Sequence, residues 1–209
     1  MNIPESAPLP NETRVWDPVV RIFHWSLVAA YTIVWLTGEE EPRVHVLAGY
    51  VIIGLVLIRV AWGFVGTKYA RFRDFVYRPS MVLAYVRDIL TGKSKRYLGH
   101  NPLGGIMIIA LLLSLLAASV TGLALPGAKE GAGPFAAITA STSVTVPVAI
   151  SKAVVDDDEG AGETWKELHE FFANLSLLLV ALHIAGVIVG NLVHRENLVR
   201  AMFTGRKPV

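Results

Sequence analysis

Residues 165–194 read WKELHEFFANLSLLLVALHIAGVIVGNLVH, the last long apolar stretch of the chain, and within it His169 and His183 lie 14 positions apart. At about 100° per residue, 14 steps of an α-helix return to within roughly 40° of the starting direction, so both rings point to nearly the same face. A rise of ~1.5 Å per residue separates them by roughly 21 Å, which is most of the ~30 Å hydrocarbon core of a membrane. The stretch therefore predicts a helix that carries one imidazole near each membrane surface.

The composition is typical of a membrane protein. Of the 209 residues, 53% are hydrophobic and only 17% are charged. The chain contains no cysteine, which excludes disulfides, thiolate metal sites, cysteine-bound iron–sulfur clusters and haem attached through thioether bonds. Any haem in this protein is therefore held without covalent attachment to the chain.

Four apolar segments are long enough to cross a bilayer, at residues 18–38, 44–66, 103–125 and 165–194. Asp17 and Pro18 are suited to the cap and the first position of the first helix. Asn101 and Pro102 open the third helix, and we expect Pro126 to end it.

A fifth, shorter helix is predicted at residues 80–91, whose apolar positions follow one helical face. We expect it to lie at the membrane interface, capped by Ser80 and ended by Gly92. The predicted fold class is an all-α membrane protein, a four-transmembrane-helix bundle with a short cytoplasmic interfacial helix. Its parts are an N-terminal tail at 1–17, a transmembrane domain at 18–194 with an external loop at 126–164, and a C-terminal tail at 195–209.

The basic side chains are segregated to one side of the predicted membrane. They follow the second and fourth helices: Lys68, Arg71, Arg73, Arg78, Arg87, Lys93, Lys95, Arg96, Arg195, Arg200, Arg206 and Lys207. The opposite side has a surplus of acids at residues 39–41, 156–159 and 163. Because basic loops stay in the cytoplasm, both termini are predicted to be cytoplasmic.

Four histidines sort into two pairs by their expected depth in the membrane. His24 and His183 fall in the inner half, whereas His45 and His169 open their helices at the outer surface. Neutral imidazole binds iron, and two axial histidines leave haem iron six-coordinate. The spacing therefore predicts two b-type haems stacked across the bilayer, with these four residues as the iron ligands.

Small and basic residues near the histidines fit this interpretation. Gly49 and Gly186 each follow a histidine by about one turn and would leave room for a macrocycle, although ordinary helix packing explains them equally well. Arg21 and Arg59 are candidates to bind haem propionates on the inner side. The alternative for both arginines is that they extend to lipid phosphate.

The other two histidines, His100 and His194, have no partner at a matching depth, and we interpret them as interfacial residues. A contact with substrate or quinone is the alternative for either one. A proton or metal transporter that uses intramembrane histidines is a further hypothesis. Against it, no Asp or Glu lies in the middle of a predicted span.

Several motifs together resemble one family. They are RIFHW at 21–25, GHNPLGG at 99–105, TGL at 121–123, the fourth-helix pattern from His169-Glu170 through Ala173-Asn174 to Leu182-His183, and HRENL at 194–198. This set resembles the bacterial di-haem cytochrome b561 family, which includes the cytochrome b subunits of nickel–iron hydrogenases. The resemblance covers roughly residues 15–206 except the external loop.

The resemblance implies a multi-pass cytochrome of the bacterial inner membrane that passes electrons between the quinone pool and a redox partner in a respiratory chain. By motif match, His24, His45, His169 and His183 carry over as ligands of two haem b groups. We expect a quinol/quinone oxidoreductase or an electron-transfer subunit with no catalytic side chain of its own, because the chemistry belongs to the cofactor. The alternative is a haem-bearing anchor subunit of a hydrogenase or other dehydrogenase, without independent activity.

The expected partners are membrane lipid, a quinone (ubiquinone or menaquinone), and either a periplasmic cytochrome c or a hydrogenase or dehydrogenase subunit. A homodimer is also compatible with the sequence, whereas nucleic acid is not an expected partner. The acidic residues 156–159 offer a docking surface for a basic external electron carrier, and a solvated loop is the alternative.

Overall fold

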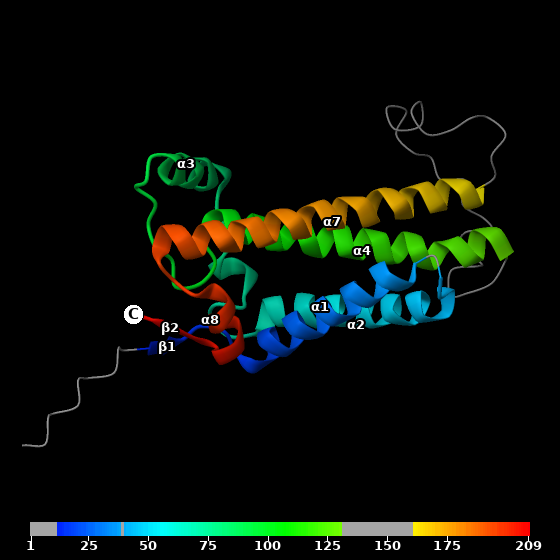
Figure 1. Cartoon of the computed structure of the whole chain (residues 1–209), viewed down its shortest axis with the longest axis horizontal. Coiled ribbons are helices and arrows are strands. Elements are labelled where there is room, and N and C mark those ends of the chain that lie inside the picture. The colour runs from blue at the N-terminus through cyan, green and yellow to red at the C-terminus, as the bar shows by residue number, and fades with distance from the viewer. Residues whose placement is uncertain (1–11, 39, 131–160) are drawn as a thin grey trace, which may run out of the picture. The chain divides into compact units, whose positions relative to one another are not determined.

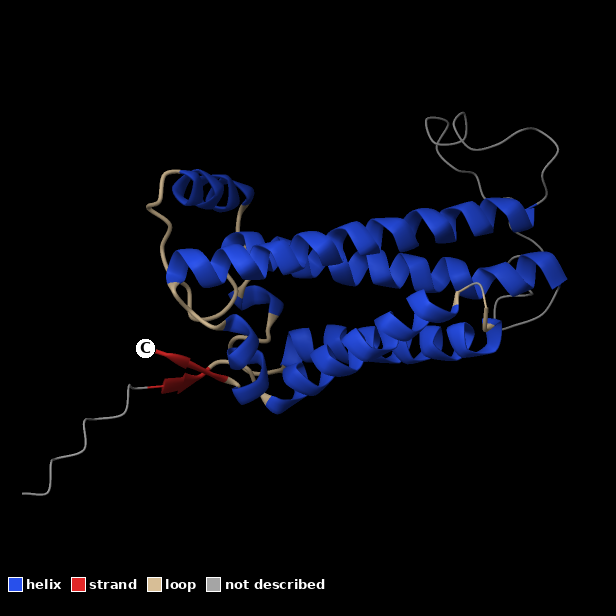
Figure 2. Ribbon diagram, viewed as in Figure 1, coloured by secondary structure: helices blue, strands red, loops and turns tan. Residues whose placement is uncertain are grey.

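The computed structural model describes residues 12–38, 40–130 and 161–209. Its elements are, in order, β1 (Glu12–Arg14), α1 (Pro18–Thr37), α2 (Pro42–Val65), the 3₁₀ helix η1 (Phe72–Asp74), α3 (Pro79–Leu90), α4 (Pro102–Glu130), α7 (Ala161–His194), α8 (Leu198–Thr204) and β2 (Arg206–Pro208) (Figures 1 and 2). Within the described residues, α1, α2, α4 and α7 are long and apolar enough to cross a membrane. The predicted all-α membrane fold with four spanning helices is therefore confirmed.

The chain divides into two compact units, and each contains parts of all four long helices. The first, which we call the terminal unit, consists of Met1–Trp25, Ala61–Ile106 and Ala185–Val209, and includes α3, α8 and both strands. The second, which we call the bundle unit, consists of Ser26–Val60 and Met107–Ile184. The bundle unit is made of the remaining parts of α1, α2, α4 and α7.

Asp17 caps α1 as the sequence predicts. Its Oδ1 accepts a hydrogen bond of 3.0 Å from the backbone N–H of Val20, and Pro18 takes the first helical position. Its Oδ2 accepts hydrogen bonds from Thr67 (2.6 Å) and from the indole of Trp62 (3.1 Å). Burial alone would raise the pKa of Asp17, but these hydrogen bonds outweigh it and hold the pKa below its ordinary value. The carboxylate thus stays ionised and ties the start of α1 to the end of α2.

Helix α3, which we predict to lie at the membrane interface, begins one residue earlier than predicted. Arg78 is the cap residue and Pro79 takes the first helical position, so the prediction of Ser80 as the cap is wrong. The reason is the proline, whose fixed φ and missing N–H suit the first turn and move the cap to the residue before it. The predicted end is confirmed, because Gly92 follows the cap residue Thr91 with a φ of 68°.

The start of α4 follows the prediction, but its end does not. Asn101 Oδ1 accepts a hydrogen bond of 2.7 Å from the N–H of Gly104 and caps the helix. At the other end the helix continues through Pro126 to Glu130, so the prediction that Pro126 ends it is wrong. A proline removes one backbone hydrogen bond and can bend a helix without ending it.

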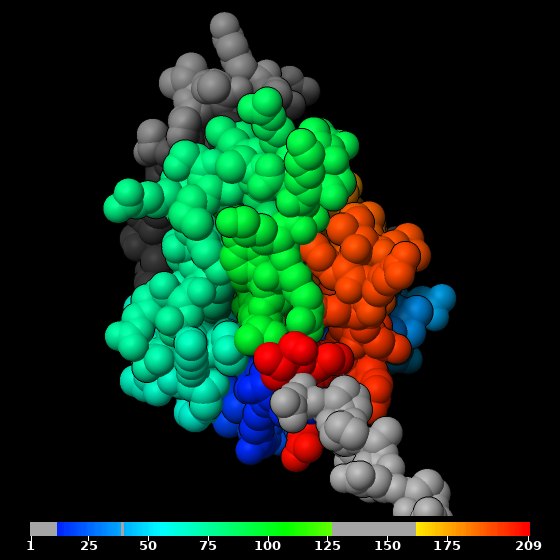
Figure 3. Space-filling model, turned by 90° about the vertical axis from the view of Figure 1, so that its left-hand side faces the viewer, coloured from blue at the N-terminus to red at the C-terminus, as the bar shows by residue number. Residues whose placement is uncertain are grey.

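The two predicted tails contain short strands that pair with each other in the terminal unit. β1 and β2 are antiparallel, with Thr13 opposite Lys207. The connection before β2 passes through Gly205, whose φ is 79° and whose carbonyl accepts hydrogen bonds from Val15 and Trp16. β2 also lies against the segment that precedes α4 (Figure 3), where the guanidinium of Arg96 donates to the carbonyl of Pro208.

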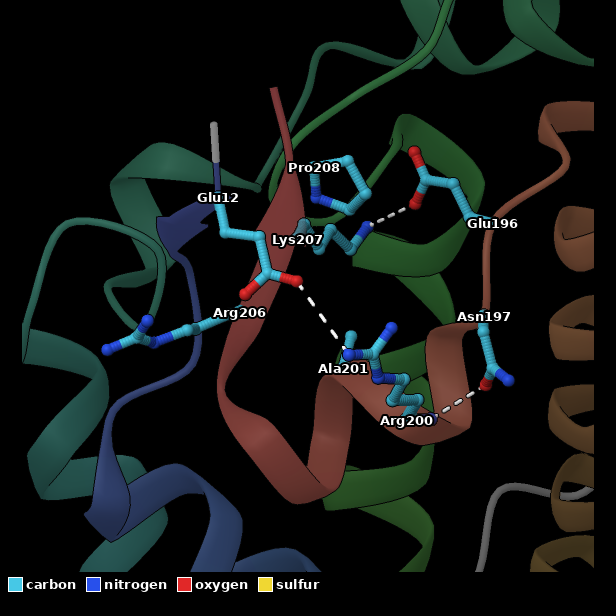
Figure 4. A pocket seen from close by; sticks show the side chains of 8 residues that line it. All are labelled: Glu12, Glu196, Asn197, Arg200, Ala201, Arg206, Lys207 and Pro208. Carbon is cyan, nitrogen blue, oxygen red and sulfur yellow. Dashed lines mark hydrogen bonds and ion pairs between the residues drawn. The ribbon is translucent and has the colours of Figure 1, made fainter. Parts of the chain in front are cut away.

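Lys207 is a buried charged residue in β2. Its side chain is 4% exposed and its ammonium lies 3.0 Å from a carboxylate oxygen of Glu196 (Figure 4). The other carboxylate oxygen of Glu196 accepts from Arg96. Burial raises the pKa of Glu196, but the two basic partners outweigh burial and lower it below the ordinary value. The C-terminal strand is therefore held by a charged group of three side chains.

Candidate functional site

The structure brings His45 and His169 together in the bundle unit. His45 lies in the first turn of α2, and His169 lies near the start of α7. Their ring centroids are 6.1 Å apart and their ring planes are inclined at 84°. These are the two residues that the sequence pairs at the outer surface, and their proximity is as predicted.

The Nδ1 atom of each ring is hydrogen-bonded to a backbone carbonyl. Nδ1 of His45 lies 2.9 Å from the carbonyl oxygen of Val34 in α1, and Nδ1 of His169 lies 2.8 Å from that of Ala118 in α4. Because a carbonyl can only accept, each Nδ1 must carry the hydrogen. In a neutral imidazole Nε2 then keeps its lone pair, which is the state that binds a metal.

A glycine in α4 allows the backbone of that helix to approach the ring of His169. A Cβ atom at Gly122 would lie 2.9 Å from Cε1 of His169, whereas a Cβ at Gly38, just after α1, would make only ordinary contact at 3.6 Å from Nδ1 of His45. The four long helices therefore all contribute to this site, α2 and α7 with side chains, α1 with a carbonyl, and α4 with a carbonyl and a glycine. The carbonyl contacts could not be predicted from the sequence, because a backbone acceptor does not depend on residue type. The TGL motif at 121–123 was the one available signal.

The chemistry of the histidine pair fits haem iron. Neutral imidazole is an iron ligand, and in each ring the hydrogen on Nδ1 leaves Nε2 with its lone pair. One turn beyond His45, a Cβ at Gly49 would meet no described atom within 4 Å. The two imidazole donors, the proximity of their rings and the space at Gly49 all fit a b-type haem.

The predicted inner ligands are each placed on the expected helix. His183 follows His169 by 14 residues on α7, which is one unbroken helix from Ala161 to His194. His24 lies in α1, where its ring meets Trp25 edge-on with centroids 5.0 Å apart. His24 belongs to the terminal unit and His183 to the bundle unit, so their pairing stays a prediction.

The two candidate arginines differ in their surroundings. The guanidinium of Arg21 donates to the carbonyl of Phe203 in the last turn of α8, an arrangement in which a cation stabilises a helix C-terminus. Arg59 in α2 is buried, with 3% of its surface exposed. That burial argues against the alternative in which Arg59 extends to lipid phosphate. The propionate role of both arginines stays a prediction.

The remaining histidines have protein neighbours in the terminal unit. The ring of His100 contacts those of Trp16 and Phe75, with centroids 4.6 Å and 4.8 Å away. Nε2 of His194 lies 3.3 Å from the hydroxyl of Tyr85 in α3. The interpretation of both as interfacial residues stays a prediction. The acidic residues 156–159 lie outside the described part of the chain.

The pocket drawn in Figure 4 also belongs to the terminal unit and contains none of the predicted site residues. Its lining is mostly charged: Glu12, Glu196, Asn197, Arg200, Ala201, Arg206, Lys207 and Pro208. Within it Glu196 pairs with Lys207, and Arg200 lies 3.9 Å from Glu12. These side chains largely neutralise one another, so we assign the pocket a structural role.

Comparison with known proteins gives consistent matches. A family model described as prokaryotic cytochrome b561 matches residues 15–205. The chain is similar to a protein of Rhizobium leguminosarum bv. viciae named "Probable Ni/Fe-hydrogenase B-type cytochrome subunit", at 30% identity over 151 residues. The match covers 57% of this chain and only 61% of that relative. A protein of the same name from Azotobacter vinelandii is 25% identical over 219 residues, which cover 91% of this chain and 86% of the relative. The "Probable Ni/Fe-hydrogenase 1 B-type cytochrome subunit" of Escherichia coli (strain K12) is 28% identical over 138 residues, 53% of this chain and 59% of the relative. No solved structure matches the chain.

Proposed function

Because the chain belongs to the prokaryotic cytochrome b561 family, we propose that it is a transmembrane electron-transfer protein with two bis-histidine b-type haems. The family makes it a membrane cytochrome b, for which haem b is the cofactor. The proposal adds the number of haems, their ligands and the route of the electrons. The observation that carries it is the facing pair of His45 and His169.

The outer haem is assigned to His45 and His169. Both rings donate Nδ1–H to a backbone carbonyl, which leaves Nε2 as the nitrogen that would bind the iron. Such a contact fixes the orientation of the ring and makes the other nitrogen a stronger ligand. Two rings held in this way would keep their positions whether the iron is oxidised or reduced, so little rearrangement would oppose electron transfer.

The inner haem is assigned to His24 and His183. His183 lies on the same α7 face as His169 to within roughly 40°, about 21 Å further along the helix. This separation supports the proposal of one haem near each surface of a hydrocarbon core ~30 Å thick. Haem supplies one-electron redox chemistry, and the chain holds two such centres at fixed spacing across the membrane. Arg59 and Arg21 are proposed to face the inner propionates.

We further propose that the protein lies in a bacterial inner membrane with both termini in the cytoplasm, because the basic segments after α2 and α7 then face inward. The electrons would move between the quinone pool and a redox partner. The relatives named as hydrogenase cytochrome subunits favour a hydrogenase as that partner. The second candidate function is therefore a haem-bearing anchor subunit of a hydrogenase or other dehydrogenase.

Alanine variants of the proposed ligands test the assignment. We expect His183→Ala to lose the inner haem and keep the outer one, and His169→Ala to do the reverse. The measurement is the haem content per chain together with the midpoint potential of each remaining haem. His194→Gln is the control and should keep both haems, because His194 faces Tyr85. Loss of the same haem in both alanine variants would contradict the proposed pairing.

Purification from native membranes separates the two candidate functions. Quinol oxidation by the isolated chain favours an independent oxidoreductase. Co-purification of a large redox subunit, with no turnover by the chain alone, favours the anchor subunit.

A further inference from the structure

The two carbonyl groups that hold the outer histidine rings occupy the same place in a repeated pattern of residues. Val34 in α1 precedes the pair Thr37-Gly38 by three residues, and Ala118 in α4 precedes the pair Thr121-Gly122 by three. All of these residues belong to the bundle unit. Each ring therefore has a threonine one helical turn beyond the carbonyl that it contacts.

The hydroxyl of Thr121 donates to the carbonyl that holds His169. Its Oγ1 lies 2.8 Å from the carbonyl oxygen of Ala117 and 3.0 Å from that of Ala118, so its single hydrogen is shared between the two. Nδ1 of His169 lies 2.8 Å from the same oxygen of Ala118 and 3.5 Å from the hydroxyl itself. Because 3.5 Å exceeds the ordinary length of an N–H···O hydrogen bond, the hydroxyl acts on the ring mainly through the carbonyl.

The carbonyl oxygen of Ala118 therefore accepts from three donors. Besides the ring of His169 and the hydroxyl of Thr121, the backbone N–H of Gly122 donates to it within the continuous helix α4. A carbonyl oxygen has two lone pairs, so the donors draw on the same electron density and each weakens the others. Thr121 is buried, with 5% of its surface exposed, which keeps water from competing for its hydroxyl. The hydrogen bond of His169 is thus weaker than it would be without Thr121.

Thr37, in the matching place on α1, uses its hydroxyl differently. It donates at 2.7 Å to the carbonyl of Ile33, the residue before Val34. Since a hydroxyl has one hydrogen, Thr37 has none left for the carbonyl of Val34 that holds His45. Of the two outer rings, the ring of His169 is therefore the one whose hydrogen bond competes with a threonine hydroxyl.

We propose that Thr121 is a positioning residue that weakens His169 as an iron ligand and thereby raises the midpoint potential of the outer haem. The proposal rests on the function proposed above, in which His45 and His169 bind this haem. A hydrogen bond from Nδ1 makes Nε2 a stronger ligand. A stronger ligand stabilises the oxidised iron, which carries the greater positive charge. Weakening the hydrogen bond therefore favours the reduced iron.

The test removes the hydroxyl of Thr121 in two ways. Thr121→Val keeps the shape of the side chain, and Thr121→Ala makes the same chemical change if valine perturbs folding. Both should shift the redox equilibrium of the outer haem toward oxidised iron by about three-fold, less than the roughly five-fold that a whole hydrogen bond contributes. For a one-electron couple, three-fold is a fall in midpoint potential of ~28 mV.

Two further variants separate this effect from a structural one. Thr121→Ser retains the hydroxyl and should restore the potential of the unaltered chain. Thr37→Val is the matched control, because Thr37 stands at the same place in the other copy of the pattern and donates to Ile33. It should leave the potential of the outer haem unchanged.

A second readout needs no haem. In the apoprotein with isotopically labelled histidine, the Nδ1–H signal of His169 in an NMR spectrum is assigned by its loss in His169→Ala. A stronger hydrogen bond moves the proton resonance downfield. We therefore expect a downfield shift in Thr121→Val and Thr121→Ala, and no shift in Thr121→Ser or Thr37→Val.

An unchanged or raised potential in Thr121→Val and Thr121→Ala would overturn the proposal while leaving the two-haem function standing. An equal fall in Thr121→Ser or Thr37→Val would do the same, as would an unchanged proton signal. If the unaltered chain binds no outer haem, the proposed function itself fails, and the proton signal alone then decides whether Thr121 acts on His169.

Discussion

Gly122→Ala should selectively weaken the outer haem site. The added Cβ would lie 2.9 Å from Cε1 and 3.0 Å from Nδ1 of His169, whereas carbon atoms in contact prefer about 3.5–4.0 Å. The ring must therefore move by roughly 0.6 Å or more, away from α4. That movement lengthens the 2.8 Å hydrogen bond from Nδ1 to the carbonyl of Ala118, which also belongs to α4. The substitution thus disturbs both the position and the hydrogen bond of the ligand.

The expected magnitude follows from these two effects. Overpacking of a filled site costs about 1–3 kcal/mol, and loss of one hydrogen bond costs about 1 kcal/mol. Together they correspond to haem binding that is roughly 30- to 700-fold weaker at the outer site. The assay is a haem titration of the apoprotein in detergent, with the two haems resolved by their potentials. Gly54→Ala is the control, because a Cβ at Gly54 would meet no described atom within 4 Å. If Gly122→Ala binds both haems as the unaltered chain does, the ring of His169 is not held against α4 and the reasoning is refuted.

Two further predictions concern the terminal unit. Asp17 has a lowered pKa in the folded chain, so its contribution to stability is present above the ordinary carboxyl pKa and is lost on acidification. Asp17→Asn should therefore unfold at a lower temperature than the unaltered chain near neutral pH. Between about pH 5 and pH 2 the variant should lose less stability than the unaltered chain. An equally steep acid dependence in Asp17→Asn would exclude Asp17 as its source. Glu196→Ala should reduce the free energy of unfolding by about 3 kcal/mol, because it leaves the buried ammonium of Lys207 without its carboxylate. Arg200→Ala, which removes an exposed ion pair with Glu12, should cost less than about 1 kcal/mol. Thermal unfolding in detergent measures both effects, and equal losses in the two variants would contradict the assignment of a buried charged group.

The features that could be predicted from sequence are those in which residue type reports the environment directly. The four spans follow from runs of apolar residues, and the cap at Asp17 follows from a carboxylate placed before Pro18. The approach of His45 to His169 follows from matching their depths, since a helix converts sequence position into depth at a fixed rise. Each of these inferences needed only local geometry and the thickness of a membrane.

The features that were missed depend on partners distant in sequence or on the backbone. The strands Glu12–Arg14 and Arg206–Pro208 are three residues each and too short for an alternating pattern. The carbonyls that hold the histidine rings come from Val34 and Ala118, residues whose side chains give no sign of this role. Pro126 was predicted to end a helix that in fact continues past it, because a proline weakens a helix locally without dictating its last residue.

The central claim is that one chain holds two b-type haems, each between two histidines. The most direct test is a reduced-minus-oxidised optical spectrum of the detergent-purified chain, with haem quantified per polypeptide. The account predicts two non-covalent, low-spin b haems per chain. One haem per chain would mean that one of the histidine pairs binds no iron, and a chain without haem after expression with adequate haem supply would contradict the account altogether.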